Sequence, residues 1–441
     1  MPGPMAPPPG WGTTGERQTV SSEPPTSSWE PLPNSQQRER VFSPAPRRGS
    51  RLARGIMRVG AFFAAGVVLI AVFALVGSGL AALSSQPWST SSPHSEATAT
   101  QAPFVALSPI SVTGHLPSPR YAAAAAWVGN QVIVVGGAID KTHFVDEIVS
   151  YAPINNVVHT MTTHLPERLA YTSLAWDDSS GTLYILGGQR ENGSFSSAIL
   201  RYDPMRDAFM QSASTLPEGR CCGTAFWDRQ RVIYVGGYAT GPNGNEYAGV
   251  DSFNPSTGEV STISHDLPGV LLAGRGLASA GNAWDGHYLY LMGGQSPSYS
   301  NYIGEVTRLD PYGDVVERVA QNGSWEVPDQ LYSGKQVLES DSCCGSAWWD
   351  STNQRVILAG GIDVDWQGST TSRNTYAFDP ATKAIQKLPW SLPEPRSHAG
   401  TASFNAGNCA LIFGGYDGST AMDSILQFEA TGESCRQIVR R

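Results

Sequence analysis

The stretch LYILGG (Leu183–Gly188) is a short apolar run that ends in a pair of glycines, and the chain contains six such runs. The pairs recur at similar intervals, and the longest step separates the fourth pair from the fifth. An internal period of about 50 residues indicates a fold built from repeated units. The pairs are Gly136–Gly137, Gly187–Gly188, Gly236–Gly237, Gly293–Gly294, Gly360–Gly361 and Gly414–Gly415.

Each unit has the same parts in the same order. An aromatic residue stands nine to eleven residues before each glycine pair, and a polar turn separates it from the apolar run. After the glycines come a variable loop, a segment that ends in an apolar residue and a turn, and a last segment that usually ends in LP. The first aromatics are Trp127, Trp176, Trp227, Trp284, Trp349 and Phe404. The later apolar positions are Tyr151, Tyr202, Phe253, Leu309, Phe378 and Phe428.

Four short strands per unit predict an all-β propeller in which each unit forms one four-stranded blade. The glycine pairs permit a sharp backbone turn and a close approach between blades. The DP and NP turns close the following hairpin. We therefore expect six blades, with the first strand of each blade lining a central channel.

Residues 104–441 resemble the kelch-repeat β-propellers in these glycine pairs and later apolar positions. The kelch pattern usually adds a tryptophan in the fourth strand, and this chain lacks it. Its repeats are therefore divergent, and they are nearer to bacterial and galactose-oxidase-like kelch sequences than to the metazoan consensus. The resemblance implies a six-bladed ring that serves either binding or catalysis, because kelch propellers include both. The fourth-strand residues are Val158, Phe209, Val260, Val316, Ile385 and Ile438.

Two segments compete to complete the sixth blade. PISVTGHLP (Pro109–Pro117) has the LP ending of a fourth strand, and SCRQIV (Ser434–Val439) lies at the end of the sixth repeat. Either pairing would close the ring and remove its sheet edges. The longest step in the repeat also predicts an insertion, Gln321–Ser340, between blades four and five.

The N-terminal region is a different kind of sequence. Residues 1–58 contain eleven prolines, eight arginines, four glutamates and no lysine. They show no apolar period, so we expect a disordered tail. Residues 59–83 then form an unbroken run without a charge, which is long enough to cross a bilayer as a helix. A Ser/Thr/Pro-rich stalk, residues 84–103, follows.

The flanks of this span predict its orientation. Five arginines in Arg47–Arg58 precede it, whereas no Asp, Glu, Lys or Arg follows until Glu96. The positive-inside rule then places the tail in the cytoplasm and the propeller outside, in a single-pass cell-membrane protein. A cleaved signal peptide is the alternative, although its apolar core usually has only about 7–15 residues. RRGSRL also has a faint resemblance to a twin-arginine export signal.

Charge narrows the choice of partners. The whole chain carries −9 and residues 1–58 carry +4, so the remainder carries −13. An acidic outer domain is not held to anionic lipid by charge. No Lys/Arg-rich cluster accompanies a nucleic-acid-binding motif, so we expect no nucleic-acid partner. The proline-rich tail is a candidate for a cytoplasmic partner that binds extended segments, although its composition fits a plain spacer as well.

Arginines recur just before the first strand of five units, seven to nine residues ahead of the aromatic. Guanidiniums grouped at one channel mouth would bind an anion. Alternatively, each pairs with an acid or carbonyl group of a neighbouring blade, as buried arginines normally do. We favour the second interpretation. The five are Arg120, Arg168, Arg220, Arg275 and Arg396.

Two adjacent cysteine pairs occupy equivalent places, in RCCGTAFWD (Arg220–Asp228) and SCCGSAWWD (Ser342–Asp350). Tyr121 and His398 stand at the same six-residue distance from their aromatics as the first cysteines, so we expect all four at one height at the channel mouth. One interpretation is a vicinal disulfide in each of Cys221–Cys222 and Cys343–Cys344, formed in an oxidising exterior. Such a ring is a flat apolar plate on which a sugar could stack.

Two other interpretations of these pairs remain open. With His398 they would make a thiolate site for copper or zinc, although no C-x-x-C or H-x-x-x-H spacing supports it. They would otherwise be small buried residues, or would form one long bridge between blades three and five. The remaining cysteines, Cys409 and Cys435, begin the second and fourth strands of blade six. We expect a Cys409–Cys435 disulfide that staples this blade.

No Ser-His-Asp arrangement, phosphate loop or metal-spaced carboxylate cluster stands out. We therefore expect no catalytic residue, cofactor or metal. The leading hypothesis is a binding module for a glycan, a cell-wall polymer or a protein partner. The alternatives are a carbohydrate-active enzyme of oxidase or epimerase type that uses the channel, and a structural scaffold. The expected ligand-binding residues are Arg120, Tyr121, Arg168, Arg220, Cys221, Cys222, Arg275, Cys343, Cys344, Arg396 and His398.

Overall fold

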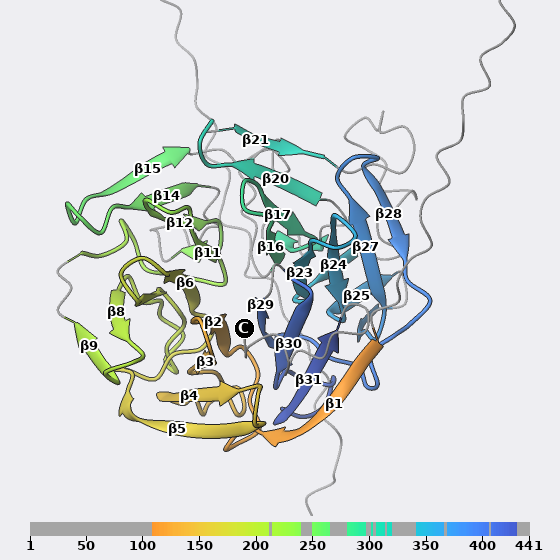
Figure 1. The fold of residues 1–441 in the computed structure, drawn as a ribbon, viewed down its shortest axis with the longest axis horizontal. Helices are drawn as coiled ribbons and strands as arrows, with labels where there is room; N and C mark the ends of the chain where they lie inside the picture. Colours follow the sequence, from red (N-terminus) through yellow and green to blue (C-terminus); the bar gives the residue numbers. More distant parts are fainter. Residues whose placement is uncertain are drawn as a thin grey trace, which may run out of the picture. The chain divides into compact units, whose positions relative to one another are not determined.

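The computed structural model contains a ring of six four-stranded antiparallel sheets, which are the blades of a β-propeller (Figure 1). It describes residues 108–210, 214–239, 249–264, 280–296, 301–302, 306–313, 315–319, 341–365, 368–404 and 407–429. The predicted tail, the span 59–83, the stalk and the insertion Gln321–Ser340 lie outside these residues. Within the described residues, no helix is long and apolar enough to cross a membrane.

The strands of the first three blades follow one another along the chain. Blade one contains β2 (Ala124–Trp127), β3 (Val132–Val135), β4 (Glu147–Ala152) and β5 (Val157–His164). Blade two contains β6 (Ser173–Asp177), β7 (Thr182–Leu186), β8 (Ile199–Asp203) and β9 (Ala208–Met210). Blade three contains β11 (Thr224–Trp227), β12 (Val232–Val235), β14 (Val250–Phe253) and β15 (Val260–Ser264).

The last three blades repeat this order, apart from the outer strand of blade six. Blade four contains β16 (Gly281–Trp284), β17 (Leu289–Met292), β20 (Val306–Asp310) and β21 (Val315–Arg318). Blade five contains β23 (Ser346–Asp350), β24 (Arg355–Ala359), β27 (Thr375–Asp379) and β28 (Ala384–Lys387). Blade six contains β29 (Gly400–Phe404), β30 (Cys409–Phe413), β31 (Ser424–Glu429) and β1 (Ser108–His115).

Strand β1 closes the ring. It runs antiparallel to β31, with Ser108 opposite Glu429 and His115 opposite Ser424. The fourth strand of the sixth blade therefore comes from the N-terminal side of the repeats, and PISVTGHLP supplies it. The competing segment, Ser434–Val439, lies outside the described residues. This closure pairs the outer edge of β31, which is how a propeller protects its sheets.

Three short sheets lie apart from the blades. They pair the segment before an inner strand with the loop after the same blade's glycine pair, or form within that loop, so they lie at one end of the channel, which we call the mouth face. We call the opposite end, where the turns between first and second strands lie, the turn face. The short strands are β10 (Arg220–Cys221) with β13 (Tyr238–Ala239), β18 (Gln295–Ser296) with β19 (Asn301–Tyr302), and β22 (Asp341–Cys343) with β25 (Ile362–Asp365) and β26 (Gly368–Thr371).

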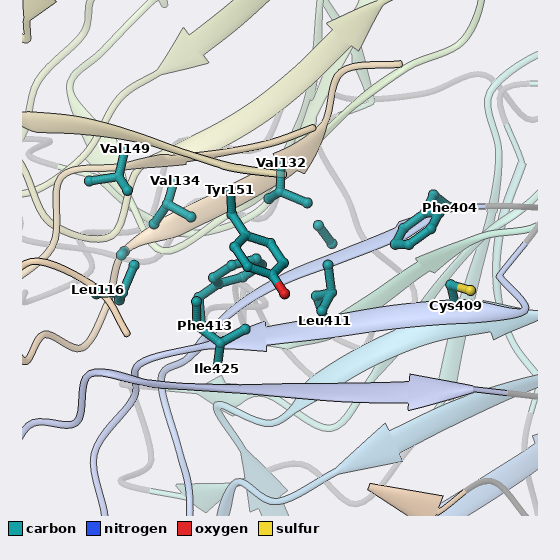
Figure 2. Close-up of a cluster of buried hydrophobic side chains, with 12 residues drawn as sticks. Leu116, Val132, Val134, Val149, Tyr151, Phe404, Cys409, Leu411, Phe413 and Ile425 are labelled. Carbon is teal, nitrogen blue, oxygen red and sulfur yellow. The ribbon is translucent and has the colours of Figure 1, made fainter. Parts of the chain in front are cut away.

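The hydrophobic core is divided into six layers, one between each pair of neighbouring blades. The second strands are buried on both faces, and alternate residues face opposite neighbours, as the two-residue period of a strand requires. In β3, Val132 and Val134 pack toward blade six, whereas Ile133 and Val135 pack toward blade two. Figure 2 shows the layer between blades one and six, where the rings of Tyr151 and Phe413 meet edge to face at 5.6 Å.

The glycine pairs form joints with the next blade. Gly187 has φ +60°, and a Cβ there would lie 2.2 Å from the carbonyl oxygen of Arg220. The amide of Gly188 donates to that same oxygen at 2.9 Å. The first glycine thus makes room for a neighbouring carbonyl, and the second binds it. The same carbonyl contacts occur at Gly136 with Leu169, Gly360 with Arg396, and Gly414 with Arg120.

Replacing Gly187 with alanine tests this joint. Gly187→Ala adds a methyl group that collides with the carbonyl, so we expect the free energy of unfolding to fall by about 3 kcal/mol or more. The matched control is Gly181→Ala, because Gly181 has φ +67° but nothing within 4 Å of its added Cβ. Backbone strain alone should cost the control about 1 kcal/mol. Equal losses in a urea titration of both variants would refute the joint.

Candidate functional site

A ring of residues in the left-handed backbone conformation surrounds the mouth of the channel. Each lies two positions before the first residue of an inner strand, the residue that pairs with the last residue of the second strand in the same blade. The φ angles of these residues lie between 50° and 66°. The position equivalent in blade four, Ser279, lies outside the described residues. Such a conformation is uncommon for residues other than glycine, so its recurrence in five blades marks a shared structural position. The five are Ala122, Tyr171, Cys222, Cys344 and His398.

Backbone hydrogen bonds connect these positions around the channel. The amide of Tyr171 donates to the carbonyl of Ala122 at 2.8 Å, and the amide of Ala122 donates to that of His398 at 2.7 Å. The amide of His398 in turn donates to the carbonyl oxygen of Cys344 at 2.8 Å, and the amide of Cys222 donates to the carbonyl oxygen of Tyr171 at 3.1 Å. Five blades are thereby tied together at one height. The ring residues are consequently held in place by backbone contacts between blades.

The five ring residues line a cavity of about 190 Å³ in the central channel. Below the ring the channel wall consists largely of small side chains and of polar groups. The close approach of the inner strands accounts for this composition, because large side chains would not fit between them. These small lining residues include Ala124, Thr224, Gly345, Gly400 and Thr401.

The cysteine pairs are bonded within themselves. Sγ of Cys221 is joined to Sγ of Cys222, and Sγ of Cys343 to Sγ of Cys344. The first cysteine of each pair is buried in a short strand, and the second belongs to the ring and lines the cavity. The structure therefore has the vicinal arrangement, not a long bridge between blades three and five. Among the described residues, no group of three or more His, Cys, Asp and Glu side chains could hold a metal.

His398 lies on the ring one residue away from its expected register. Counting back from the aromatic placed it level with Cys221 and Cys343, whereas the structure places it level with Cys222 and Cys344. The reason is that Phe404 is the fifth residue of β29, while Trp227 is the fourth residue of β11. Tyr121 does have the expected register, because it pairs with the loop after its glycines as Cys221 does.

Two tyrosine rings contact His398, and a third tyrosine packs against one of them. The His398 ring meets Tyr171 edge to face at 5.7 Å and Tyr121 at 6.3 Å, and Tyr121 lies 5.6 Å from Tyr416. Ala122 separates Tyr171 from His398 along the ring, and its small side chain leaves room for them to meet. Neither Tyr171 nor Tyr416 was among the residues expected from the sequence, since each stands outside the six-residue spacing from its aromatic.

Burial keeps this cluster uncharged at neutral pH. Burial lowers the pKa of His398 to about 4, so its imidazole is neutral. Burial also raises the pKa of Tyr171, and raises that of Tyr121 with a further contribution from the charge of Asp140. His398 Nδ1 lies 3.2 Å from the Ser397 hydroxyl. The five ring residues thus offer aromatic rings, sulfur atoms and neutral polar groups, and none of them is charged at neutral pH.

Three of the expected arginines are buried inside the blades instead of lining the cavity. Arg120, Arg220 and Arg396 are each at most 1% exposed. Arg220 forms an ion pair with Asp251 of β14, and its guanidinium lies 4.2 Å from the centre of the Tyr234 ring. Arg120 donates to Glu147 at 2.5 Å, and Arg396 donates to the Gly414 carbonyl at 2.6 Å. These contacts correspond to the favoured interpretation, in which the arginines are structural.

The remaining two expected arginines do not join this set. Arg168 stands one residue before the equivalent position, which Leu169 occupies. Its side chain is 57% exposed and lies beside Glu191. Arg275 lies outside the described residues. None of the four described arginines lines the cavity at the mouth.

Cys409 is disulfide-bonded in the structure. Its expected partner, Cys435, lies outside the described residues, so the Cys409–Cys435 bridge stays a prediction. Cys409 begins β30, as the sequence predicts, and it is buried in the layer between blades one and six.

Comparison with known proteins supports the fold and no more. The solved structure titled "Structure of YjhT" matches with a TM-score of 0.55 and 17% sequence identity. The match covers 71% of this chain and 96% of that one. No protein-family model matches the chain, and no curated protein matches it either. The fold and the ring at its mouth together define a six-bladed β-propeller.

Removing a buried arginine distinguishes a structural role from anion binding. Arg220→Met leaves Asp251, which is 1% exposed, as a buried charge without this partner. We expect the free energy of unfolding to fall by about 3–5 kcal/mol. Arg168→Met is the exposed control and should cost less than about 1 kcal/mol. An Arg220→Met loss no larger than that of the control in urea unfolding would contradict the structural role.

The neutral state of His398 predicts a pH dependence of stability. Its pKa is about 4 in the folded protein, below the ordinary value of 6.5. As the pH falls from about 6.5 to about 4, the unfolded chain takes up a proton that the folded chain refuses, so stability decreases. His398→Asn removes this group while keeping a residue type that tolerates a positive φ. Thermal unfolding at pH 7 and pH 4.5 should show a smaller pH effect in the variant; an unchanged difference would count against a neutral buried imidazole.

Proposed function

We propose that this protein is a membrane-anchored, kelch-type propeller that binds a ligand at its mouth face on the outer side of the membrane. A glycan segment, free or in a cell-wall polymer, is the ligand that the chemistry of the mouth fits best; a protein partner is the second choice. The observation that carries the proposal is the neutral ring of Tyr171, His398 and the two vicinal disulfides at one height.

The surfaces of this ring suit a sugar. The faces of a pyranose present C–H groups, which pack on aromatic rings and on apolar sulfur atoms. Tyr121, Tyr171 and Tyr416 supply rings, and Cys222 and Cys344 supply sulfur. Tyrosine hydroxyls and the imidazole beside them are neutral hydrogen-bonding groups that match sugar hydroxyls. Pockets with apolar walls and a few fixed polar groups are typical ligand sites.

The rigidity of the ring supports a binding role. Backbone hydrogen bonds already fix the left-handed positions before any ligand arrives. A preformed site loses little conformational entropy on binding, and this raises its affinity. The small lumen below, lined by residues such as Ala124 and Gly400, admits only a narrow group. A ligand is therefore expected to lie across the mouth and to insert one substituent.

Membrane anchoring and orientation rest on residues 1–83. The uncharged run over residues 59–83 and the five arginines before it support an uncleaved anchor with the propeller outside. An oxidising exterior is also the compartment in which adjacent cysteines are kept as disulfides. The net charge of −13 outside residues 1–58 keeps the propeller off anionic lipid headgroups.

Glycan screening of the full chain in detergent tests the proposal. We expect a neutral oligosaccharide to bind, and Tyr171→Leu to weaken its Kd about tenfold because a stacking ring is lost. Leu suffers the same backbone strain as Tyr at this position, so the fold changes little. Arg168→Gln is the control, because this side chain is exposed and is not one of the five ring residues, and it should bind as the wild type does.

Reduction gives a second, independent arm of the same experiment. Opening the Cys221–Cys222 and Cys343–Cys344 rings with a dithiol should weaken binding, since the sulfur plates lose their fixed shape. Binding that withstands both reduction and Tyr171→Leu would move the ligand site away from the mouth. If a protein partner binds in place of any glycan, and its binding is weakened by both reduction and Tyr171→Leu, the mouth is the binding site but the ligand is not a glycan.

A further inference from the structure

A second candidate site lies on the turn face, between blades two and three. A groove of about 500 Å³ opens there, remote from the ring at the mouth. Its wall includes Tyr184 of β7, Arg201 of β8 and Trp227 of β11. Turn residues of both blades complete it, among them Gln230 and Asn254. The groove does not depend on the function proposed for the mouth.

A buried cationic group in this groove has unmet hydrogen-bonding capacity. Nε of Arg201 is buried without a hydrogen-bond partner among the described residues, and the Tyr184 hydroxyl lies beside Arg201 and Ser180. No acidic side chain of the described chain forms an ion pair with Arg201. Burial raises the pKa of Tyr184, and the charge of Arg201 nearby partly offsets that effect. Unpaired groups of this kind are costly in a folded protein, so they indicate a place for a ligand.

Blade four contains the same arrangement with its acid included. Arg308 stands opposite Tyr290 in the sheet as Arg201 stands opposite Tyr184. Across the next strand pair, Arg308 faces Glu317 and forms an ion pair with it. Blade four thus supplies the anion for its own arginine.

The tryptophan wall is shared as well. Trp349 stacks on Tyr290 at 5.9 Å, and Trp227 stacks on Tyr184 at 6.2 Å. Each tryptophan lies in the first strand of the blade that follows its tyrosine. The aromatic wall is therefore a feature of both repeats and not an accident of blade two.

The two arrangements differ at the outer-strand position that faces the arginine. The position of Glu317 is taken in blade two by Met210, which faces Arg201. Blade two has therefore kept the cation and the aromatic wall of the arrangement but not its carboxylate. In place of an internal ion pair it has a groove open to solvent. The group missing from that groove is a carboxylate.

We propose that this groove binds a carboxylate-bearing sugar, of the hexuronate type. Its carboxylate pairs with Arg201 as Glu317 does with Arg308, which is the strong charge-assisted geometry of a guanidinium. Its ring lies along the partly exposed indole of Trp227. Its hydroxyls meet the side-chain amides of Gln230 and Asn254.

The charges around the groove are compatible with an anion. Arg229, which is exposed, adds a second positive charge at its edge. Asp177 is the acid in the wall, and the hydroxyls of Ser179 and Ser180 each donate to its carboxylate at 2.6 Å. Burial of Asp177 would raise its pKa, but these hydrogen bonds outweigh burial and lower it. Its oxygens are thus directed into their own turn, and the two arginines outnumber it.

The test is calorimetric titration of the full chain in detergent with glucuronate, glucose and acetate. We expect glucuronate to bind at least tenfold more tightly than glucose, and acetate to bind weakly to the same place. Met210→Glu installs the internal acid of blade four and should weaken glucuronate binding by tenfold or more. Met210→Gln is the matched control, equal in shape but uncharged, and should bind as the wild type does.

Two further variants locate the site. Arg201→Gln should lose glucuronate binding to the same extent as Met210→Glu, and Tyr171→Leu at the mouth should leave it unchanged. Equal affinity for glucose and glucuronate, absence of glucuronate binding, or full binding by Met210→Glu would each overturn the proposal. Binding of an acidic peptide at Arg201 without binding of glucuronate would overturn the sugar as well. None of these outcomes bears on the mouth, whose own test uses a neutral glycan.

Discussion

The joint between one blade's glycine pair and the next blade's carbonyl oxygen is the constraint on which the rest of the ring depends. At Gly187 no side chain fits, because a Cβ would lie 2.2 Å from the Arg220 oxygen. The amide of Gly188 then binds this oxygen, and the buried Arg220 side chain anchors the same residue within its own blade. Close approach of the second strands follows from this joint, and with it the six apolar layers between blades.

The mouth inherits its geometry from these joints. The residue two positions after each joint carbonyl takes the left-handed conformation and donates its amide to a neighbouring blade. Four different residue types take this conformation at the five described positions, because hydrogen bonds between neighbouring blades hold the backbone there. The chemistry of the mouth is therefore set by residue identity alone, and the identities here are alanine, tyrosine, cysteine and histidine. On the turn face, Met210 faces Arg201 where Glu317 faces Arg308 in blade four, and the groove lies beside this arginine.

The repeat was readable from the sequence because glycine pairs and aromatics mark fixed places in each blade. The six blades and the inner position of the first strands follow from that spacing and are confirmed. The adjacent disulfides were one of three open interpretations, and spacing could not choose among them. Counting six residues back from Phe404 gives a register for His398 that is one residue off. The correct reference is Gly400, the residue of β29 that pairs with Phe413 at the end of β30. The contact between Tyr171 and His398 crosses a blade, so no local pattern predicts it.

The closure of blade six gives the order of synthesis a physical meaning. Strand β1 is made before the other described strands, whereas β31, its sheet partner, is made only after the five other blades. Each of those blades completes its sheet from strands of one stretch of chain as the chain lengthens. During that interval β1 is a strand edge without a partner, which is the kind of edge that other chains can add to. Pairing of β1 with β31 therefore reports on every blade between them, because the two strands meet only when the whole ring has formed.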